Sequence, residues 1–263
     1  MRKWKTSSGI EIFQVLSGRS NSYLIRYEKG NILVDTGKTS AFDELVKSLR
    51  QLRVQMNEVG YLVLTHTHFD HCQNAAKLKS SGNCQIIVGQ PEAFFAESGY
   101  TPLPKGVFLL TRIISTLGNW IGKARFGYEP IHPDILIQDE TSMFVANTNR
   151  DEYSHASSIR QLKNKLYSDE TKLDDRVKIV PTPGHSAGSI SLIIDNEIAL
   201  VGDALFGVFR NSVLPPFADD FTPTIKSWGT LLASGCRTFL PGHGRPITRD
   251  LLQRELEKFS EKN

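Results

Sequence analysis

The sequence predicts an α+β protein in which two mixed β-sheets pack face to face and helices cover their outer faces, a four-layer sandwich. Two observations carry this prediction. Short runs of β-branched and aromatic residues gather in two halves, residues 10–88 and 177–241, and segments with helical spacing of apolar residues follow the strands in each half. Each sheet is therefore expected to bury one face against the other sheet and the opposite face under helices.

The first half opens with three strands and a helix. The strands, broken by Gly, Ser and Asn, are predicted to be consecutive and antiparallel, and they are residues 10–16, 22–27 and 31–35. After a turn at Thr36 and Gly37, residues 40–52 place apolar side chains at three-to-four spacing, which predicts a helix over the sheet. Thr39 or Ser40 is expected to cap this helix.

Two strand–helix steps follow. A buried strand at residues 61–65 leads to a helix at about 72–80, and a strand at 84–88 leads to a short helix near 92–97. The second half contains four strands and two helices. The strands are residues 177–181, 189–195, 197–202 and 237–241, and the helices lie near 223–234 and 248–261.

Residues 101–175 are less regular, and we interpret them as an insertion in a single domain that spans residues 1–263. Within the insertion, residues 107–121 have the spacing of an amphipathic helix. One interpretation is that this helix packs on the edge of the sandwich. Another is that it forms a lid whose apolar side accepts an acyl or aromatic group. Binding to a membrane surface is disfavoured because the basic residues of the segment supply little charge.

Composition narrows the class of protein. Lys and Arg exceed Asp and Glu by only 31 to 28, with no block of like charges, so no nucleic-acid partner is expected. No apolar run is long enough to span a membrane, and the basic N-terminus precedes no signal-like segment. The three cysteines form no CxxC pair, which favours reduced thiols and a cytoplasmic location. The expected partner is a small molecule.

The strongest functional feature is a group of metal-binding residue types directly after the strand at 61–65. It has the spacing His-x-His-x-Asp-His and comprises His66, His68, Asp70 and His71. In a strand His66 and His68 share a face, whereas Asp70 and His71 require the chain to turn. We therefore expect a loop that gives one pair of ligands to each of two metal ions.

Three more candidate ligands follow predicted strands. They are His185 in Pro-Gly-His-Ser, Asp203 in Val-Gly-Asp-Ala and His243 in Pro-Gly-His-Gly. Each lies next to glycine, which permits close approach of the backbone where several loops meet. Five of the seven histidines of the chain belong to these motifs, and His132 and His155 do not.

These motifs, in this order, resemble the metallo-β-lactamase fold superfamily, and the turn at residues 34–37 is also similar. The similarity runs from about residue 10 to residue 247. It implies one zinc site formed by His66, His68 and His185, a second formed by Asp70, His71 and His243, and a bridging Asp203. Nitrogen and carboxylate ligands also suit Mn²⁺ and Fe, so the resemblance implies two divalent ions, with zinc the first expectation.

A bridging Asp203 is typical of the glyoxalase II-like thioesterases, lactonases and phosphodiesterases of this superfamily rather than of the β-lactamases that hydrolyse antibiotics. The resemblance thus implies a hydrolase of an ester, thioester or lactone with an apolar portion. The nucleophile would be a metal-bridging hydroxide. Asp70 is the expected catalytic residue, since it could bind metal and also orient the hydroxide or pass on its proton.

Three alternatives remain open at this point: an iron-dependent sulfur dioxygenase, a phosphodiesterase, and a non-catalytic metal-binding protein. The last is disfavoured because all seven ligands are present. Many members of the superfamily form dimers, so a homodimer is one expected oligomeric state. Asp35 and Cys72 are expected to support the loops and the start of a helix rather than to bind metal.

Overall fold

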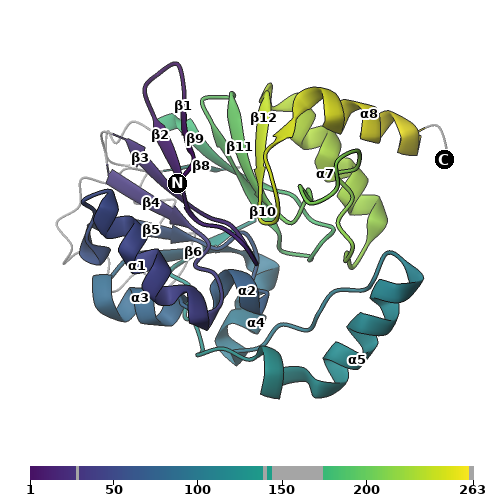
Figure 1. Ribbon diagram of the computed structural model, residues 1–263, viewed down its shortest axis with the longest axis horizontal. Helices are drawn as coiled ribbons and strands as arrows, with labels where there is room; N and C mark the ends of the chain where they lie inside the picture. Colours follow the sequence, from purple (N-terminus) through teal and green to yellow (C-terminus); the bar gives the residue numbers. More distant parts are fainter. Residues whose placement is uncertain (28–29, 139–140, 144–173, 261–263) are drawn as a thin grey trace.

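The computed structural model describes residues 1–27, 30–138, 141–143 and 174–260, and their strands form two sheets (Figure 1). The seven-stranded sheet has the order β1 (Lys3–Lys5), β2 (Glu11–Leu16), β3 (Ser22–Tyr27), β4 (Gly30–Val34), β5 (Val59–Val63), β6 (Gln85–Gly89) and β7 (Ile135–Ile137). The six-stranded sheet has the order β13 (Ile247–Thr248), β12 (Thr238–Pro241), β11 (Ile198–Gly202), β10 (Ile190–Ile194), β9 (Asp174–Pro181) and β8 (Thr141–Met143).

Alternation of side chains along the strands builds three separate cores. In β5, Val63 points into the core between the two sheets, whereas Leu62 packs under the helices of the first sheet. In β11, Leu200 points between the sheets and Val201 packs under the helices of the second sheet. Neighbouring residues of a strand face opposite sides, so each sheet is apolar on both faces. Burial of one such side chain contributes about 2 kcal/mol.

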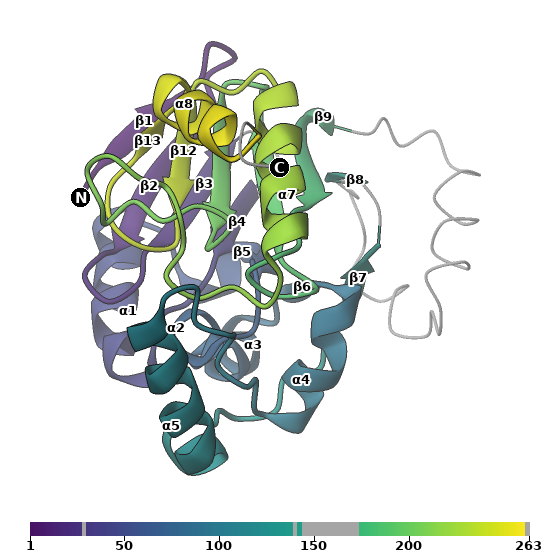
Figure 2. The ribbon, with the colours of Figure 1, turned by 90° about the vertical axis from the view of Figure 1, so that its right-hand side faces the viewer.

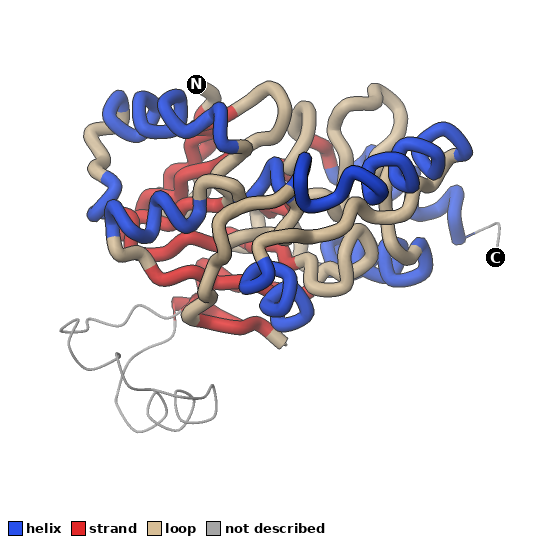
Figure 3. Tube along the Cα trace, turned by 90° about the horizontal axis from the view of Figure 1, so that it is seen from below, coloured by secondary structure: helices blue, strands red, loops and turns tan. Residues whose placement is uncertain are grey.

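Helices cover the outer face of each sheet (Figures 1 and 3). The first sheet packs against α1 (Phe42–Gln51), α3 (Ala75–Gly82) and α4 (Ala93–Ser98), and the second against α7 (Phe221–Ala233) and α8 (Arg249–Ser260). Two further helices are α2 (Phe69–Cys72), whose Cys72 joins the core on the outer face of the first sheet, and α5 (Leu109–Phe126), which is broken at Gly122. Short 3-10 turns occupy η1 (Thr39–Ala41), η2 (Met56–Glu58) and η3 (Gln90–Glu92). The predicted four-layer sandwich of two mixed sheets is confirmed.

Some local predictions were wrong. Neither Thr39 nor Ser40 caps α1, because both lie in η1 and the helix begins at Phe42 without a side-chain cap. The helix expected at 72–80 is two helices, α2 and α3, and the first starts at Phe69. The short edge strands β1 and β13 were not predicted, since two or three residues carry too little pattern.

The region at 101–175 contributes to both sheets. β7 pairs in parallel with β6, and β8 pairs antiparallel with β9. Part of this region, residues 144–173, lies outside the described residues.

Strand directions bring several strand ends to one edge of the sandwich. β11 and β12 are parallel, and β9 runs the same way because both β9 and β11 are antiparallel to β10. The two sheets are joined at this edge by backbone and side-chain hydrogen bonds. Ile190 N donates to Thr65 O at 2.9 Å, and Asn21 Nδ2 donates to Pro241 O at 2.9 Å. Residues that follow β5, β9, β11 and β12 are therefore held together.

Candidate metal centre

The His-x-His-x-Asp-His motif leaves β5 as an extended segment and then turns into a helix. His68 has extended backbone angles at the N-terminus of α2, and Asp70 and His71 lie within that helix. The predicted loop is thus correct only for the first two ligands. The turn of α2 points the Asp70 and His71 side chains to a different position from those of His66 and His68.

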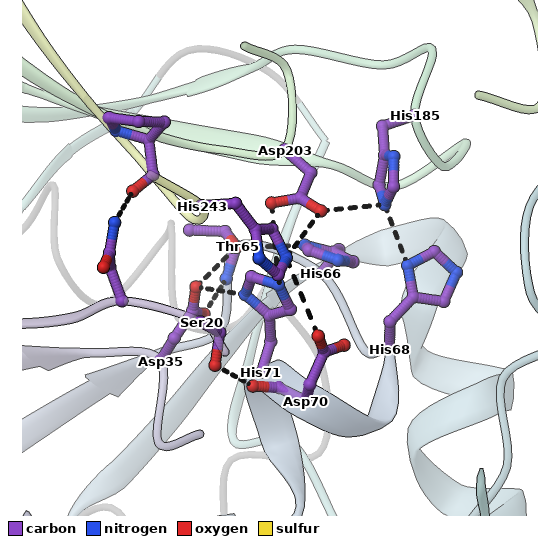
Figure 4. A network of polar contacts seen from close by, with 12 residues as sticks. Ser20, Asp35, Thr65, His66, His68, Asp70, His71, His185, Asp203 and His243 are labelled. Atoms are coloured by element: carbon purple, nitrogen blue, oxygen red, sulfur yellow. Dashed lines mark hydrogen bonds and ion pairs between the residues drawn. The ribbon is translucent and has the colours of Figure 1, made fainter. Parts of the chain in front are cut away.

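The second sheet supplies the other three predicted residues. His185 follows β9, Asp203 directly follows β11, and His243 follows β12 by one residue. All three side chains point toward the motif after β5 (Figure 4). The structure therefore brings together the seven residues that the sequence analysis singled out.

Ring nitrogens and carboxylate oxygens of these residues converge at short range. His68 Nδ1 lies 2.9 Å from His185 Nε2, and His71 Nε2 lies 3.3 Å from His243 Nε2. Asp203 lies between these pairs, with Oδ2 at 3.5 Å from His185 Nε2 and 3.3 Å from His243 Nε2. Such facing nitrogens and a central carboxylate form a cage of electron-pair donors.

Three groups of these residues have ligand atoms that all lie within 4.8 Å of one another. The groups are His66 with His68 and His185, Asp70 with His71 and His243, and His66 with His71 and Asp203. The first two equal the two ligand sets that the resemblance implied. The third links them through Asp203, which suits a position between two ions.

Two buried ligand atoms that have no hydrogen-bond partner indicate whether a metal ion fits this site. Among the described residues, no hydrogen-bond partner lies near His66 Nε2 or Asp203 Oδ1, although both atoms are buried. Buried polar atoms without partners are costly and rare in proteins. A cation bound between these atoms would satisfy both, and imidazole nitrogen with carboxylate oxygen suits zinc, manganese or iron. The residues therefore fit a divalent metal centre.

Hydrogen bonds on the far side orient the imidazoles. His71 Nδ1 donates to Asp35 Oδ2 at 2.8 Å, and His185 Nδ1 donates to the carbonyl of Phe217 at 2.8 Å. His243 Nδ1 likewise bonds the carbonyl of Arg19. In each ring this makes Nδ1 the donor to the far side and leaves Nε2 directed into the cluster. Bonds of this kind fix the tautomer and ring orientation of metal-binding histidines.

Electrostatics divide the imidazoles around one anionic carboxylate: His66 and His68 favour the neutral form, whereas at His71 and His243 the neighbouring carboxylates outweigh burial and raise the pKa. Burial and neighbouring imidazoles hold the pKa of His66 and of His68 well below the ordinary histidine value. Burial acts to raise the pKa of Asp203, but the surrounding histidines outweigh it and hold the pKa well below the usual carboxyl range. Burial also acts to lower the pKa of His71, but Asp203 and Asp35 outweigh it and raise that pKa to about 10.

Two buried carboxylates hold the ligand loops in place. Asp35 Oδ1 accepts from Thr65 N and Oδ2 from Thr65 Oγ1, both at 2.8 Å, so Asp35 fixes the start of the motif. Glu92 accepts from Thr67 N at 3.0 Å and from Gly188 N at 3.2 Å, which ties the segment after β5 to the segment after β9. Sequence analysis missed Glu92, because its partners lie 25 and 96 residues away and no local pattern marks it.

Two glycines next to ligand residues are required because a side chain at either position would clash or strain the backbone. A Cβ atom on Gly242 would lie 2.4 Å from Asp203 Oδ1 and 2.6 Å from His71 Cε1. Gly184, next to His185, has φ of +135°, a conformation that L side chains rarely adopt. Glycine at these two positions therefore lets the loops that carry His185 and His243 lie closer to the cluster than they could with a larger residue there.

A cavity of about 250 Å³ opens beside the cluster. Five of the seven candidate ligands line it: His68, Asp70, His185, Asp203 and His243. The rest of the wall is mostly apolar and comprises Phe69, Leu103, Pro104, Phe206, Pro215, Pro216 and Phe217. Arg19 adds a cationic side chain, with Nε at 3.7 Å from Asp70 Oδ2. Arg19 was not predicted either, since a lone arginine before a strand carries no signal.

The remaining candidates lie outside the cluster. Cys72 is fully buried at the end of α2, where its Sγ contacts the carbonyl of Thr67, and it belongs to none of the three ligand groups. His132 is exposed, and His155 lies outside the described residues.

Comparison with known proteins establishes the family. The model of the metallo-β-lactamase superfamily matches residues 17–243, so the chain belongs to that superfamily of metallo-hydrolases. A probable metallo-hydrolase of Methanocaldococcus jannaschii is 26% identical over 187 residues, which are 71% of this chain and 68% of that protein.

Solved structures show the same fold. A metallo-β-lactamase of Cronobacter sakazakii superposes with a TM-score of 0.64 at 16% identity, over 100% of this chain and 94% of the other. An archaeal superfamily protein of Sulfolobus tokodaii superposes with a TM-score of 0.58 at 16% identity, over 96% of this chain and 87% of the other. The expected family and fold are thus confirmed. Within the described residues, no helix is long and apolar enough to cross a membrane.

Proposed function

We propose that the protein is a dinuclear metal-dependent hydrolase that cleaves an ester, thioester or lactone. The observation that carries the proposal is the position of Asp203 between two groups of ligands that both reach the wall of one cavity. Each group offers three donors and leaves room for water and substrate, as catalytic sites do.

The chain's own residues account for binding of the substrate. The apolar wall formed by Phe206, Phe217 and Leu103 suits an acyl chain or ring beside the reacting carbonyl. Arg19, which is exposed on one side and lines the cavity, suits an anionic or polar group at the other end of the substrate. A small molecule with an apolar portion fits this arrangement.

Proton transfer is assigned to Asp70. Its carboxylate lines the cavity, with Oδ2 at 3.6 Å from His243 Nε2. Asp70 Oδ2 orients the attacking water, accepts its proton and passes the proton to the leaving group. The seven residues would hold divalent ions, which would supply Lewis acidity at the wall of the cavity. No nucleophilic side chain is required.

The test couples metal analysis to a panel of substrates. Purified protein is analysed for zinc, manganese and iron, then assayed on thioesters, lactones, simple esters, phosphodiesters and β-lactams, with and without a chelator. We expect about two ions per chain and chelator-sensitive cleavage of one of the first three classes. His68→Ala should lose both bound metal and hydrolytic activity. His132→Ala, which changes an exposed histidine away from the site, should keep both.

Other outcomes would contradict the proposal. One iron per chain with oxygen consumption would indicate a dioxygenase, and turnover confined to phosphodiesters would indicate a phosphodiesterase. Two tightly bound ions without turnover of any substrate would indicate a non-catalytic metal-binding protein.

A further inference from the structure

Helix α5 presents its apolar side chains to solvent. Ser115 and Gly118 are buried against the protein, so the face with small residues points inward. The outward side chains are large and apolar, and their exposed fractions are high: Leu109 76%, Leu110 67%, Ile113 51%, Ile114 45%, Leu117 60%, Trp120 84% and Ile121 46%. A contiguous exposed patch of this kind marks an interaction surface.

Specific contacts fix this orientation. Ser115 Oγ donates to the carbonyl of Pro104 at 2.7 Å, and Asn119 Oδ1 accepts from Leu103 N at 2.7 Å. A Cβ atom on Gly118 would lie 2.4 Å from Leu103 Cδ1, so a larger residue there would have to displace the Leu103 side chain. Turning the apolar side chains inward would break these hydrogen bonds and crowd Leu103.

The helix stands at the periphery, near the entrance of the metal centre. It lies apart from both sheets and on the same side as α2 (Figures 1 and 2). The backbone of α5 is broken at Gly122, with φ of 40° and ψ of −130°, so the exposed apolar residues 109–121 form the part before the break. Beyond the break, the Phe126 ring contacts the Phe69 ring of α2, with centroids 4.8 Å apart. Leu103 and Pro104, which the helix holds through Ser115, also line the cavity.

Charge indicates what covers the patch. Residues 99–128 contain Lys105, Arg112, Lys123 and Arg125 and no Asp or Glu, although the whole chain has 28 acidic residues. A second copy bound through this face by two-fold symmetry would bring the two sets of positive charge together. A surface of anionic lipid headgroups would instead neutralise them, while its acyl region accepts the apolar side chains.

We propose that α5 is an interfacial helix that docks the protein onto an anionic lipid surface. The helix lies in the plane of the surface, consistent with the finding that no described helix can cross a membrane. Trp120, the most exposed of its large side chains, enters the boundary between headgroups and acyl chains, where tryptophan is favoured. The sequence alone disfavours a membrane because this segment has few basic residues. The exposed apolar face, which periodicity could not show, supplies the main attraction, and the few charges favour an anionic surface over a neutral one.

The test uses the full-length protein and vesicles of defined composition. Phosphatidylcholine vesicles with and without phosphatidylglycerol are mixed with the protein, and sedimented protein is measured. We expect binding to the anionic vesicles to be at least about tenfold stronger than to the neutral ones, and to weaken with salt. Of the three tryptophans, Trp228 is already fully buried and Trp4 packs against Tyr23, so a fluorescence shift to shorter wavelength should come from Trp120 and be absent from Trp120→Ser.

Matched variants separate the helix from the rest of the surface. Leu117→Ser combined with Trp120→Ser should abolish binding, and because both side chains are exposed the fold should be retained, as circular dichroism checks. Arg112→Glu with Arg125→Glu should weaken binding to anionic vesicles about tenfold or more. Lys47→Glu with Arg50→Glu makes the same change of charge on α1 and should leave binding intact.

Three results would overturn the proposal. The wild-type protein fails to bind anionic vesicles, or it binds neutral and anionic vesicles equally well. The third such result is that the protein does not bind vesicles, while sedimentation velocity shows a dimer that the Leu117 and Trp120 substitutions dissociate. That result would mean that a second copy of the chain covers the helix. None of these measurements depends on hydrolytic activity, so the outcome is independent of the proposed function.

Discussion

Asp35 accepts a hydrogen bond from His71, with Asp35 Oδ2 at 2.8 Å from His71 Nδ1 and both side chains buried. The bond uses the Nδ1 proton of the imidazole and directs Nε2 toward Asp203 and His243. The same carboxylate also bonds Thr65 at the start of the motif. Asp35, which directly follows β4, thus fixes both the start of the motif and the orientation of the His71 ring.

Asp35→Asn should therefore weaken metal binding without removing a ligand. The three bonds use both carboxylate oxygens, so an amide presents its N–H group either to Thr65 N or to His71 Nδ1, and either the start of the motif or the His71 ring loses its orientation. Metal affinity is expected to fall about 10–100-fold. Competition with a chromophoric chelator measures it, and Asp43→Asn on the exposed side of α1 is the matched control. An affinity equal to that of the wild type would show that Asp35 plays no part in orienting the ligand.

Removal of metal should destabilise the fold. Without ions, the cluster leaves two buried atoms unsatisfied and holds imidazole nitrogens at 2.9–3.3 Å. Metal that binds only the folded state adds about 4 kcal/mol when its concentration is 1,000 times Kd. We expect chelator to lower Tm of the wild type clearly and to leave Tm of His68→Ala almost unchanged. A wild-type Tm that does not respond to chelator or to added zinc would contradict a metal centre here.

Much of this centre could be predicted from sequence, because strand ends followed by His, Asp and Gly are local patterns. The four layers follow likewise from alternation and helical spacing. Other features depend on distant partners. Glu92 bonds Gly188, which lies 96 residues further along the chain, and α2 forms where the sequence indicated a loop. Periodicity showed which residues of α5 share a face, but not that the face points to solvent, since that depends on what lies beside the helix.

Two glycines offer a matched pair of substitutions. Gly242→Ala places a methyl group 2.4 Å from Asp203 Oδ1, so we expect at least about tenfold weaker metal binding and lower stability. At Gly229, in the middle of α7, a methyl group would meet no atom within 4 Å. Gly229→Ala should stabilise the protein by about 0.5–1 kcal/mol, because alanine favours a helix. Thermal unfolding and metal titration of both variants check this, and equal behaviour of the two would refute the role of Gly242.

The three thiols should be unreactive in the folded protein. Cys72, Cys84 and Cys236 are all free and buried. Burial disfavours the thiolate and raises the pKa of each, that of Cys84 to about 11. Because the thiolate is the reactive form, its fraction at Cys84 stays low until the pH approaches that value. At pH 8 we expect a chromogenic disulfide reagent to modify none of the thiols in native protein and all three after denaturation. Rapid modification of one thiol in the native state would mean that its surroundings open to solvent, and Cys72 would be the informative case because it follows His71 directly.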